Sequence, residues 1–279
     1  MLAFPSIQMM KQLDKSQVVQ LVNTYFCNGD EIFMKLAEWN IHKMTNDISV
    51  KQFVIDKLID VDADVICLVE YLSDKGIEEN LKEKYWFEES NTISGNKVFI
   101  AVKKELAPDG IKVTNKNEVI GCYNFLHIEF LMQNGEPLSV IGVRMLSPID
   151  ASKQTPSLQE YISRLSTPFL CTGDFNIKDF RMAKWFPNIS TEKMINTDCV
   201  LSNSSIIYID KYSCEVTGFG AVDHVLHSNN INVESEYDWK FLSCDSIYPC
   251  INKIAIGTIW DIPPAYPDHA LMISNIKIN

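Results

Sequence analysis

The tetrapeptide Gly173-Asp174-Phe175-Asn176 follows an apolar run at residues 168–171, and this junction constrains the fold more than any other part of the chain. An apolar run of that length predicts a buried β-strand, and the residues after it predict the point where the strand leaves the sheet. Because side chains alternate along an extended segment, we expect Asp174 and Asn176 to share one face while Phe175 turns into the core. A carboxylate and a carboxamide on one face could accept a proton and hold an oxygen. Taken alone, the same residues are also typical of an ordinary turn.

Further runs along the chain predict the remaining strands and helices. Apolar runs of strand length fall at residues 33–41, 64–70, 97–102, 125–130, 137–143, 205–209, 221–226 and 270–278. Helical spacing of apolar residues predicts helices at 16–33, 49–59 and 157–165. Several strands follow one another without a helix between them. This order favours an α/β architecture with mixed sheets over a purely parallel, doubly wound sheet.

The chain is expected to form one domain. No Pro- or Gly-rich linker, internal repeat or low-complexity stretch divides its 279 residues, and that length allows one substantial core. We therefore expect a single domain over residues 1–279, with an N-terminal helical extension over about residues 1–33. The hydrophobic share of 46% and the charged share of 22% are ordinary for a globular protein and exclude general disorder.

Charge and cysteine usage limit the classes of partner and compartment. The net charge of -11 argues against broad electrostatic capture of nucleic acid or an anionic membrane. It does not exclude a nuclease, because a cleft lined with carboxylates binds cations that reverse the local field. None of the eight cysteines forms a C-x-x-C pair, which favours buried, reduced thiols over a zinc cluster or a disulfide frame. With no leader pattern and no apolar segment of membrane-spanning length, a cytoplasmic protein is expected.

Six apolar runs end in polar residues of the kinds used in catalysis. They are Trp39-Asn40, Val69-Glu70, Val143-Arg144, Gly173-Asp174-Phe175-Asn176, Val222-Asp223-His224 and Pro267-Asp268-His269. The order of W-N, a strand-closing Glu, G-D-x-N, V-D-H-V and a final D-H resembles the endonuclease/exonuclease/phosphatase superfamily, which has the deoxyribonuclease I fold. Each motif alone is commoner as a cap, a solvated charge or a turn, but all five in order make coincidence the weaker explanation. The resemblance covers the chain from about residue 35 to its end.

The resemblance implies a fold, a reaction and a cofactor. The fold is a four-layer α/β/β/α sandwich, with two mixed sheets packed face to face, helices outside, and a cleft where the strand ends converge. The reaction is hydrolysis of a phosphoester with a divalent cation, usually Mg²⁺ and alternatively Mn²⁺. A phosphodiester repels nucleophiles because its oxygens are negatively charged, so its hydrolysis needs a cation, a base for the water and donors for the transition state. Oxygen ligands suit Mg²⁺, which takes only one or two protein carboxylates.

Three residues correspond to the family's cation site. The resemblance implies that Glu70 is the main metal ligand, with Asn40 beside it holding the metal or a phosphate oxygen. Asp268 would be a second metal position or part of the water network.

Four other residues correspond to the family's catalytic groups. Asp174 would orient and deprotonate the attacking water, and Asn176 would steady the scissile phosphate. His269 would donate to a phosphate oxygen, while Asp223 would fix its ring and favour its charged form. The other histidines lack such support and are expected to be structural or surface residues: His42, His127, His224 and His227.

Arg144 departs from the family pattern. The family usually places a His, or in some branches a Tyr, at the end of the strand before G-D-x-N, where this chain has Arg144. A guanidinium binds phosphate well but cannot give up a proton. Two interpretations stay open, namely a phosphate clamp and an ion pair with Glu70 or Asp174.

The substrate does not follow from these motifs, because loops select it. A phosphodiesterase is the leading interpretation, with a nuclease as its first subclass, so the expected partner is a phosphoester and nucleic acid is one candidate. A phosphatase or phosphodiesterase for a small phosphorylated metabolite or a lipid head group suits the acidic composition slightly better. A catalytically silent binding module is the third interpretation. Residues 227–267 are expected to hold an extra loop or hairpin beside the cleft.

Overall fold

The computed structural model describes residues 32–42, 48–73, 75–92, 95–116, 124–146, 148–195, 201–209, 216–243 and 267–279. The helix predicted at residues 16–33 lies outside them, except for Ile32 and Phe33, which begin the first strand instead. In the described part of the chain, no helix combines the length and the apolar character needed to cross a membrane.

Seven strands form the first sheet, in the order β10-β14-β15-β1-β2-β4-β3. Their bounds are β1 Ile32–Asn40, β2 Val65–Tyr71, β3 Tyr85–Glu89, β4 Lys97–Lys103, β10 Lys193–Met194, β14 Ile231–Asp238 and β15 Leu271–Ile278. Strands β1 and β2 are parallel, whereas β15 and β4 run antiparallel to their neighbours in the sheet. The sheet is therefore mixed, as predicted.

Six strands form the second sheet, in the order β5-β6-β7-β8-β13-β9. Their bounds are β5 Lys112–Lys116, β6 Phe125–Leu131, β7 Pro137–Arg144, β8 Phe169–Asp174, β9 Ser190–Thr191 and β13 Asp223–His227. Strands β7 and β8 are parallel, and β13 runs antiparallel to β8. A separate two-stranded ribbon joins β11 Ile206–Ile209 to β12 Val216–Gly220.

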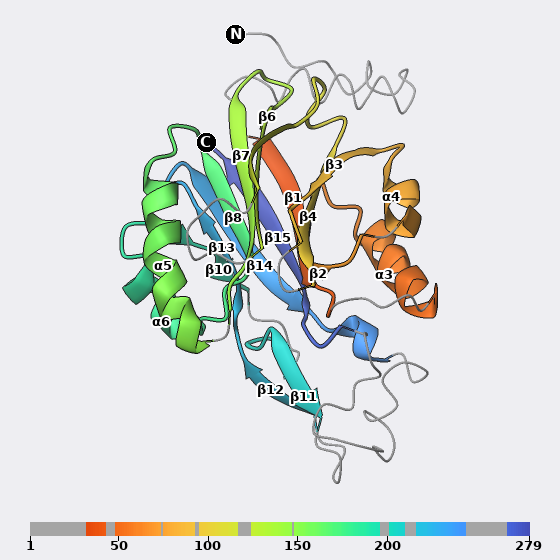
Figure 1. Cartoon of the computed structure of the whole chain (residues 1–279), viewed down its shortest axis with the longest axis vertical. Coiled ribbons are helices and arrows are strands. Elements are labelled where there is room, and N and C mark those ends of the chain that lie inside the picture. The colour runs from red at the N-terminus through yellow and green to blue at the C-terminus, as the bar shows by residue number, and fades with distance from the viewer. Residues whose placement is uncertain are drawn as a thin grey trace, which may run out of the picture.

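Helices flank the two sheets on opposite sides (Figure 1). They are α3 Ile48–Val61 and α4 Lys75–Leu81 beside the first sheet, and α5 Pro148–Ser163 and α6 Asp179–Trp185 beside the second. Leu158 of α5 and Met182 of α6 belong to the same buried apolar cluster as Val143 of the second sheet. The predicted α/β sandwich of two mixed sheets is confirmed.

Most predicted elements match the structure, and the differences have local causes. The predicted strands begin within two residues of observed strands and end within three, the largest difference being the run at 168–171, since β8 continues to Asp174. The helix predicted at 157–165 begins earlier, because α5 continues through Pro156 back to Pro148. The predicted insertion at 227–267 is wrong in its first part, since β14 pairs with β15 along its whole length and belongs to the first sheet. Residues 244–266 of that stretch lie outside the described residues.

The strand directions bring the polar residues of the six motifs to one edge of the sandwich. In the first sheet, Asn40 and Glu70 lie at the carboxyl ends of parallel strands, and His269 precedes the start of the antiparallel β15. In the second sheet, Asp174 ends β8 opposite Asp223, which starts the antiparallel β13. Residues far apart in sequence therefore meet where the two sheets end together.

Candidate active site

Strand β8 delivers Asp174 to this edge and ends there. Gly173, just before it, has a φ of 139°, and a Cβ at that position would lie 1.9 Å from the carbonyl oxygen of Val143. Only glycine fits such a close approach with that backbone conformation. Phe175 then turns into the core and is fully buried, as predicted.

Asn176 meets Asp174 through a turn and not through strand alternation. Its φ of 52° is left-handed, so the expectation of an extended segment past Asp174 is wrong. The backbone N–H of Asn176 donates to Oδ1 of Asp174 at 2.9 Å, and its Nδ2 donates to Oδ2 at 3.0 Å. Nδ2 also donates to the carbonyl oxygen of Met145 at 2.8 Å. Both amide hydrogens therefore have protein acceptors, and the amide orients the Asp174 carboxylate.

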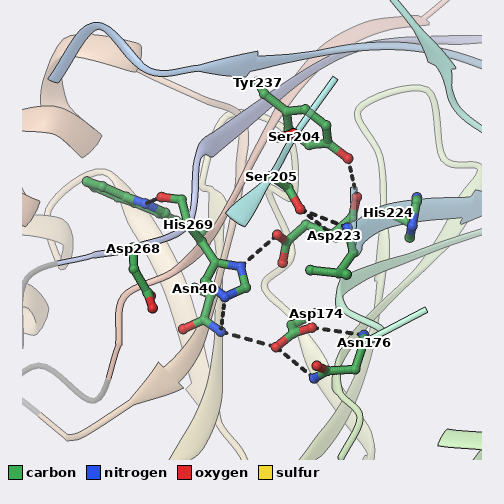
Figure 2. Close-up of polar contacts among 12 residues, drawn as sticks. Asn40, Asp174, Asn176, Ser204, Ser205, Asp223, His224, Tyr237, Asp268 and His269 are labelled. Atoms are coloured by element: carbon green, nitrogen blue, oxygen red, sulfur yellow. Dashed lines mark hydrogen bonds and ion pairs between the residues drawn. The ribbon is translucent and has the colours of Figure 1, made fainter. Parts of the chain in front are cut away.

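His269 and Asp223 form a second pair beside Asp174 (Figure 2). Nδ1 of His269 lies 2.7 Å from Oδ2 of Asp223, and the pair is buried. Backbone contacts hold both residues. The indole N–H of Trp39 donates to the carbonyl oxygen of His269 at 2.9 Å, and the Tyr237 hydroxyl donates to that of Asp223 at 2.7 Å. The ring is thus fixed from its backbone and from one of its nitrogens.

Asn40 lies between the two pairs. Its Nδ2 lies 3.2 Å from Oδ2 of Asp174 and 3.4 Å from Nε2 of His269 (Figure 2). Its Oδ1 accepts the backbone N–H of His42 at 3.0 Å, which fixes the orientation of the amide. A carboxylate and an imidazole from different sheets therefore face one carboxamide.

Burial and neighbouring charges tune the two titratable groups. Burial, and after it the nearby Asp223 carboxylate, raises the pKa of Asp174 to about 7. A carboxyl group with that pKa is partly ionised near neutral pH and can accept a proton there. Burial disfavours a charged His269 ring, but the Asp223 carboxylate outweighs this effect and holds the pKa of His269 well above its usual range. The charged ring carries a hydrogen on Nε2, which can be donated to a ligand.

Glu70 faces this edge because of a break in its strand. The pairing of β2 with β4 shifts register between Leu68 and Tyr71, and Glu70 has a left-handed φ of 53°. Such a bulge re-aims a side chain that strand alternation would send to the other face. The Glu70 carboxylate then meets Arg144, whose Nε donates to Oε1 at 2.7 Å and whose Nη2 also contacts Oε1. The structure thus brings Arg144 to Glu70 as an ion pair, one of the two interpretations above.

Asp268 is paired with a histidine that the sequence did not single out. Nδ1 of His42 lies 3.1 Å from Oδ1 of Asp268. Burial works against ionisation of Asp268, but the contact with His42 outweighs it and lowers the pKa of Asp268. The same contact raises the pKa of His42. The position of His42 two residues after Asn40 was a signal available in the sequence.

The residues proposed as cation ligands suit Mg²⁺ by their chemistry. Glu70 and Asp268 offer carboxylate oxygens and Asn40 an amide oxygen, and Mg²⁺ takes few protein ligands and keeps its waters. Among the residues that the structure describes, no cluster of three or more His, Cys, Asp or Glu residues forms a denser metal site. Both Arg144 contacts go to Oε1 of Glu70, which leaves Oε2 for another ligand. The donor set fits one cation held mainly through Glu70.

Two further buried residues near the site were not predicted from the sequence. Glu38 lies two positions before Asn40 on β1, and burial raises its pKa well above the usual range. The Ser205 hydroxyl accepts the backbone N–H of Asp223 at 3.1 Å. Alternation along β1 could have placed Glu38 on the Asn40 face, but no local signal links Ser205 to Asp223. Of the histidines left out of the site, three are buried as structural residues: His127, His224 and His227.

The chain matches known proteins in structure but not in sequence. No protein-family model matches the chain, and no curated protein sequence matches it. The structure is similar to that of an endonuclease/exonuclease/phosphatase family protein from Bacteroides thetaiotaomicron, with a TM-score of 0.60 and 11% sequence identity. The match covers 90% of this chain and 100% of that protein's chain.

Two further structures give the same result. D. rerio TDP2, complexed with a single strand DNA product, has a TM-score of 0.58 and 13% sequence identity. The match covers 88% of this chain and 98% of the TDP2 chain. ANGEL2, a 2',3'-cyclic phosphatase in complex with adenosine-2',3'-vanadate, has a TM-score of 0.59 and 11% sequence identity. The match covers 89% of this chain and 96% of the ANGEL2 chain. The chain therefore shares the fold of these proteins, and the fold expected from its motifs is confirmed.

Proposed function

We propose that this chain, which has the deoxyribonuclease I-like fold, is a divalent-metal-dependent phosphoester hydrolase. The observation that carries the proposal is the meeting of Asp174 and His269 at Asn40. A buried carboxylate with a pKa of about 7 and a buried, charged imidazole lie on either side of one amide. A base and a hydrogen-bond donor facing one point are what attack of water on a phosphoester needs.

Each residue has a role in this proposal. Asp174 accepts a proton from the attacking water, and Asn176 holds the Asp174 carboxylate in place. Nε2–H of His269 donates to a phosphate oxygen, where negative charge builds up in the transition state. Asp223 holds the ring by Nδ1 and stabilises its charge.

The proposed cation belongs at Glu70, with Asn40 and Asp268 beside it. A bound Mg²⁺ or Mn²⁺ would supply positive charge to the phosphoryl group and its leaving oxygen. The protein's own part there is to hold Oε2 of Glu70 at the edge of the sheet, through the bulge at Glu70.

A phosphodiesterase, with a nuclease as its first subclass, is our leading proposal for the substrate. It is supported by two similar structures, D. rerio TDP2 with a single strand DNA product and ANGEL2 with adenosine-2',3'-vanadate. A small phosphorylated metabolite or a lipid head group is the alternative, which the net charge of -11 favours. A catalytically silent binding module is opposed by the complete set of Asp174, His269 and Asp223.

A substrate panel with Mg²⁺ or Mn²⁺ tests the proposal and separates its alternatives. It contains plasmid DNA, abasic-site oligonucleotide, single-stranded RNA, inositol phosphates, sphingomyelin and bis-p-nitrophenyl phosphate. Turnover that disappears in both Asp174→Ala and His269→Ala is expected for at least one substrate. Turnover that survives both substitutions would remove the enzymatic assignment from this site.

A further inference from the structure

Arg144 and Glu70 form an ion pair at the position where the proposed function needs a cation ligand. The side chains are 16% and 12% exposed, so the pair is largely removed from water. Both guanidinium contacts go to the same carboxylate oxygen. We propose that Arg144 is a resident counter-ion of Glu70 that sets the affinity of the site for a divalent cation. This inference rests on the proposed function, because it concerns the same cation.

The pair is built into the backbone on both sides. Glu70 is turned towards Arg144 by the bulge in β2 and its φ of 53°. The backbone N–H of Arg144 donates to the carbonyl oxygen of Asn124 at 3.0 Å, and Arg144 lies opposite Asp174 in the pairing of β7 with β8. Because both side chains are largely buried, water and salt screen the pair less than they screen an exposed pair. This sets the contact apart from a surface ion pair, which contributes little.

The main proposed cation ligand already faces a positive charge. The Glu70 carboxylate contacts the Arg144 guanidinium through Oε1. A Mg²⁺ site gains most of its affinity from carboxylates whose charge is not otherwise compensated. A cation on Oε2 of Glu70 would sit beside a guanidinium that is always charged, and the two would repel each other in a partly buried site. The charge of Arg144 therefore lowers the affinity of Oε2 for a cation.

Binding of Mn²⁺ to the 279-residue chain, followed by electron paramagnetic resonance of the free ion at pH 8, tests this inference without using turnover. Arg144→Gln is expected to bind Mn²⁺ roughly tenfold tighter than the wild type, because it removes the competing charge. Arg144→Met, uncharged at any pH, is a second variant with the same expectation should the first not fold. Arg144→Lys keeps the charge and should bind as the wild type does.

Two controls test whether the change in Mn²⁺ affinity comes from the Arg144–Glu70 pair. Arg164→Gln removes an exposed arginine that pairs with Glu160 on α5, and it should leave Mn²⁺ affinity unchanged. Adding Glu70→Gln to Arg144→Gln should abolish the gain. Equal affinity in the wild type, Arg144→Gln and Arg144→Met would overturn the inference and leave the proposed function standing. Absence of binding in every variant would overturn both the inference and the cation part of the proposed function.

Discussion

Nδ1 of His269 lies 2.7 Å from Oδ2 of Asp223, although the two residues are 46 positions apart in the sequence. The contact joins the loop before β15 of the first sheet to the start of β13 in the second sheet. One hydrogen bond between the sheets therefore fixes the group proposed to donate to the phosphate.

Replacing Asp223 by Asn should reduce turnover strongly. The carboxylate that stabilises the charged His269 ring is lost, and the amide can no longer favour the protonated form. We expect kcat to fall by about 10²–10³-fold, by analogy with the loss of a single transition-state donor. Initial rates on the best substrate of the panel measure this change in kcat. Rates within a factor of about two of the wild type would show that the pair has no part in the reaction.

Replacing Asn176 by Ala tests whether its amide orients Asp174 or contacts the substrate. Both amide hydrogens are donated to Asp174 and Met145, so we expect kcat to fall by roughly 10²-fold while KM changes little. A steady-state comparison of kcat and KM separates the two roles. A large rise in KM would instead support the direct phosphate contact expected from the family pattern.

The buried pair of His224 and Glu192 should contribute to stability. Nδ1 of His224 lies 2.8 Å from Oε1 of Glu192 and Nε2 lies 2.9 Å from the carbonyl oxygen of Ile177, so both ring nitrogens face acceptors and both carry hydrogens. Glu192→Gln leaves a buried imidazolium without its partner and should cost about 3–5 kcal/mol of unfolding free energy.

Urea unfolding at pH 6 measures that cost. Glu234→Gln is the matched control, because it breaks an exposed pair with Lys193 and should cost no more than about 1 kcal/mol. Equal losses in the two variants would contradict a special contribution from the buried pair.

His127 should make the fold sensitive to acid. It is fully buried, Nδ1 lies 2.7 Å from the Tyr161 hydroxyl, and burial lowers its pKa to about 4. Its folded pKa lies below the unfolded value of about 6.5, so the unfolded state binds a proton first as the pH falls. The contribution of neutral His127 to the free energy of unfolding is therefore fully present above pH ~6.5. This contribution falls by about 3 kcal/mol as the pH drops to ~4.

Urea unfolding at pH 7.0 and pH 4.5 tests the contribution of His127. The wild type should lose about 2–3 kcal/mol more than His127→Gln between the two values, because Gln does not titrate but can still accept from Tyr161. The same loss in both proteins would place the acid sensitivity elsewhere.

The sequence was sufficient for the fold and for the meeting of the strand ends. Apolar runs that end in Asn40 and Asp174 predict strands, and the family resemblance carried by the order of the motifs implies which strand ends lie together. The direction of Glu70 was not predictable, because it depends on a bulge and a left-handed backbone that alternation does not encode. The same limit applies to Asn176, whose turn replaces the extended segment that was expected.

Other differences come from the length and position of elements. Helices α4 and α6 have seven residues each, too few for helical spacing to stand out. Strand β14 was mistaken for part of an insertion, although the alternation of Ile231, Val233, Ser235 and Tyr237 was present in the sequence. The Arg144–Glu70 contact was one of two open interpretations, and only the packing of the two sheets decides between the partners of Arg144.

The central claim is that Asp174 serves a cation-dependent hydrolysis. Its most direct test is the initial rate of bis-p-nitrophenyl phosphate hydrolysis with Mn²⁺, measured for the wild type and Asp174→Asn on the same folded preparations. We predict turnover that EDTA abolishes and that falls at least ~10³-fold in Asp174→Asn, since the variant has no base for the water. Equal rates in the two proteins, or turnover that EDTA does not affect, would contradict the account.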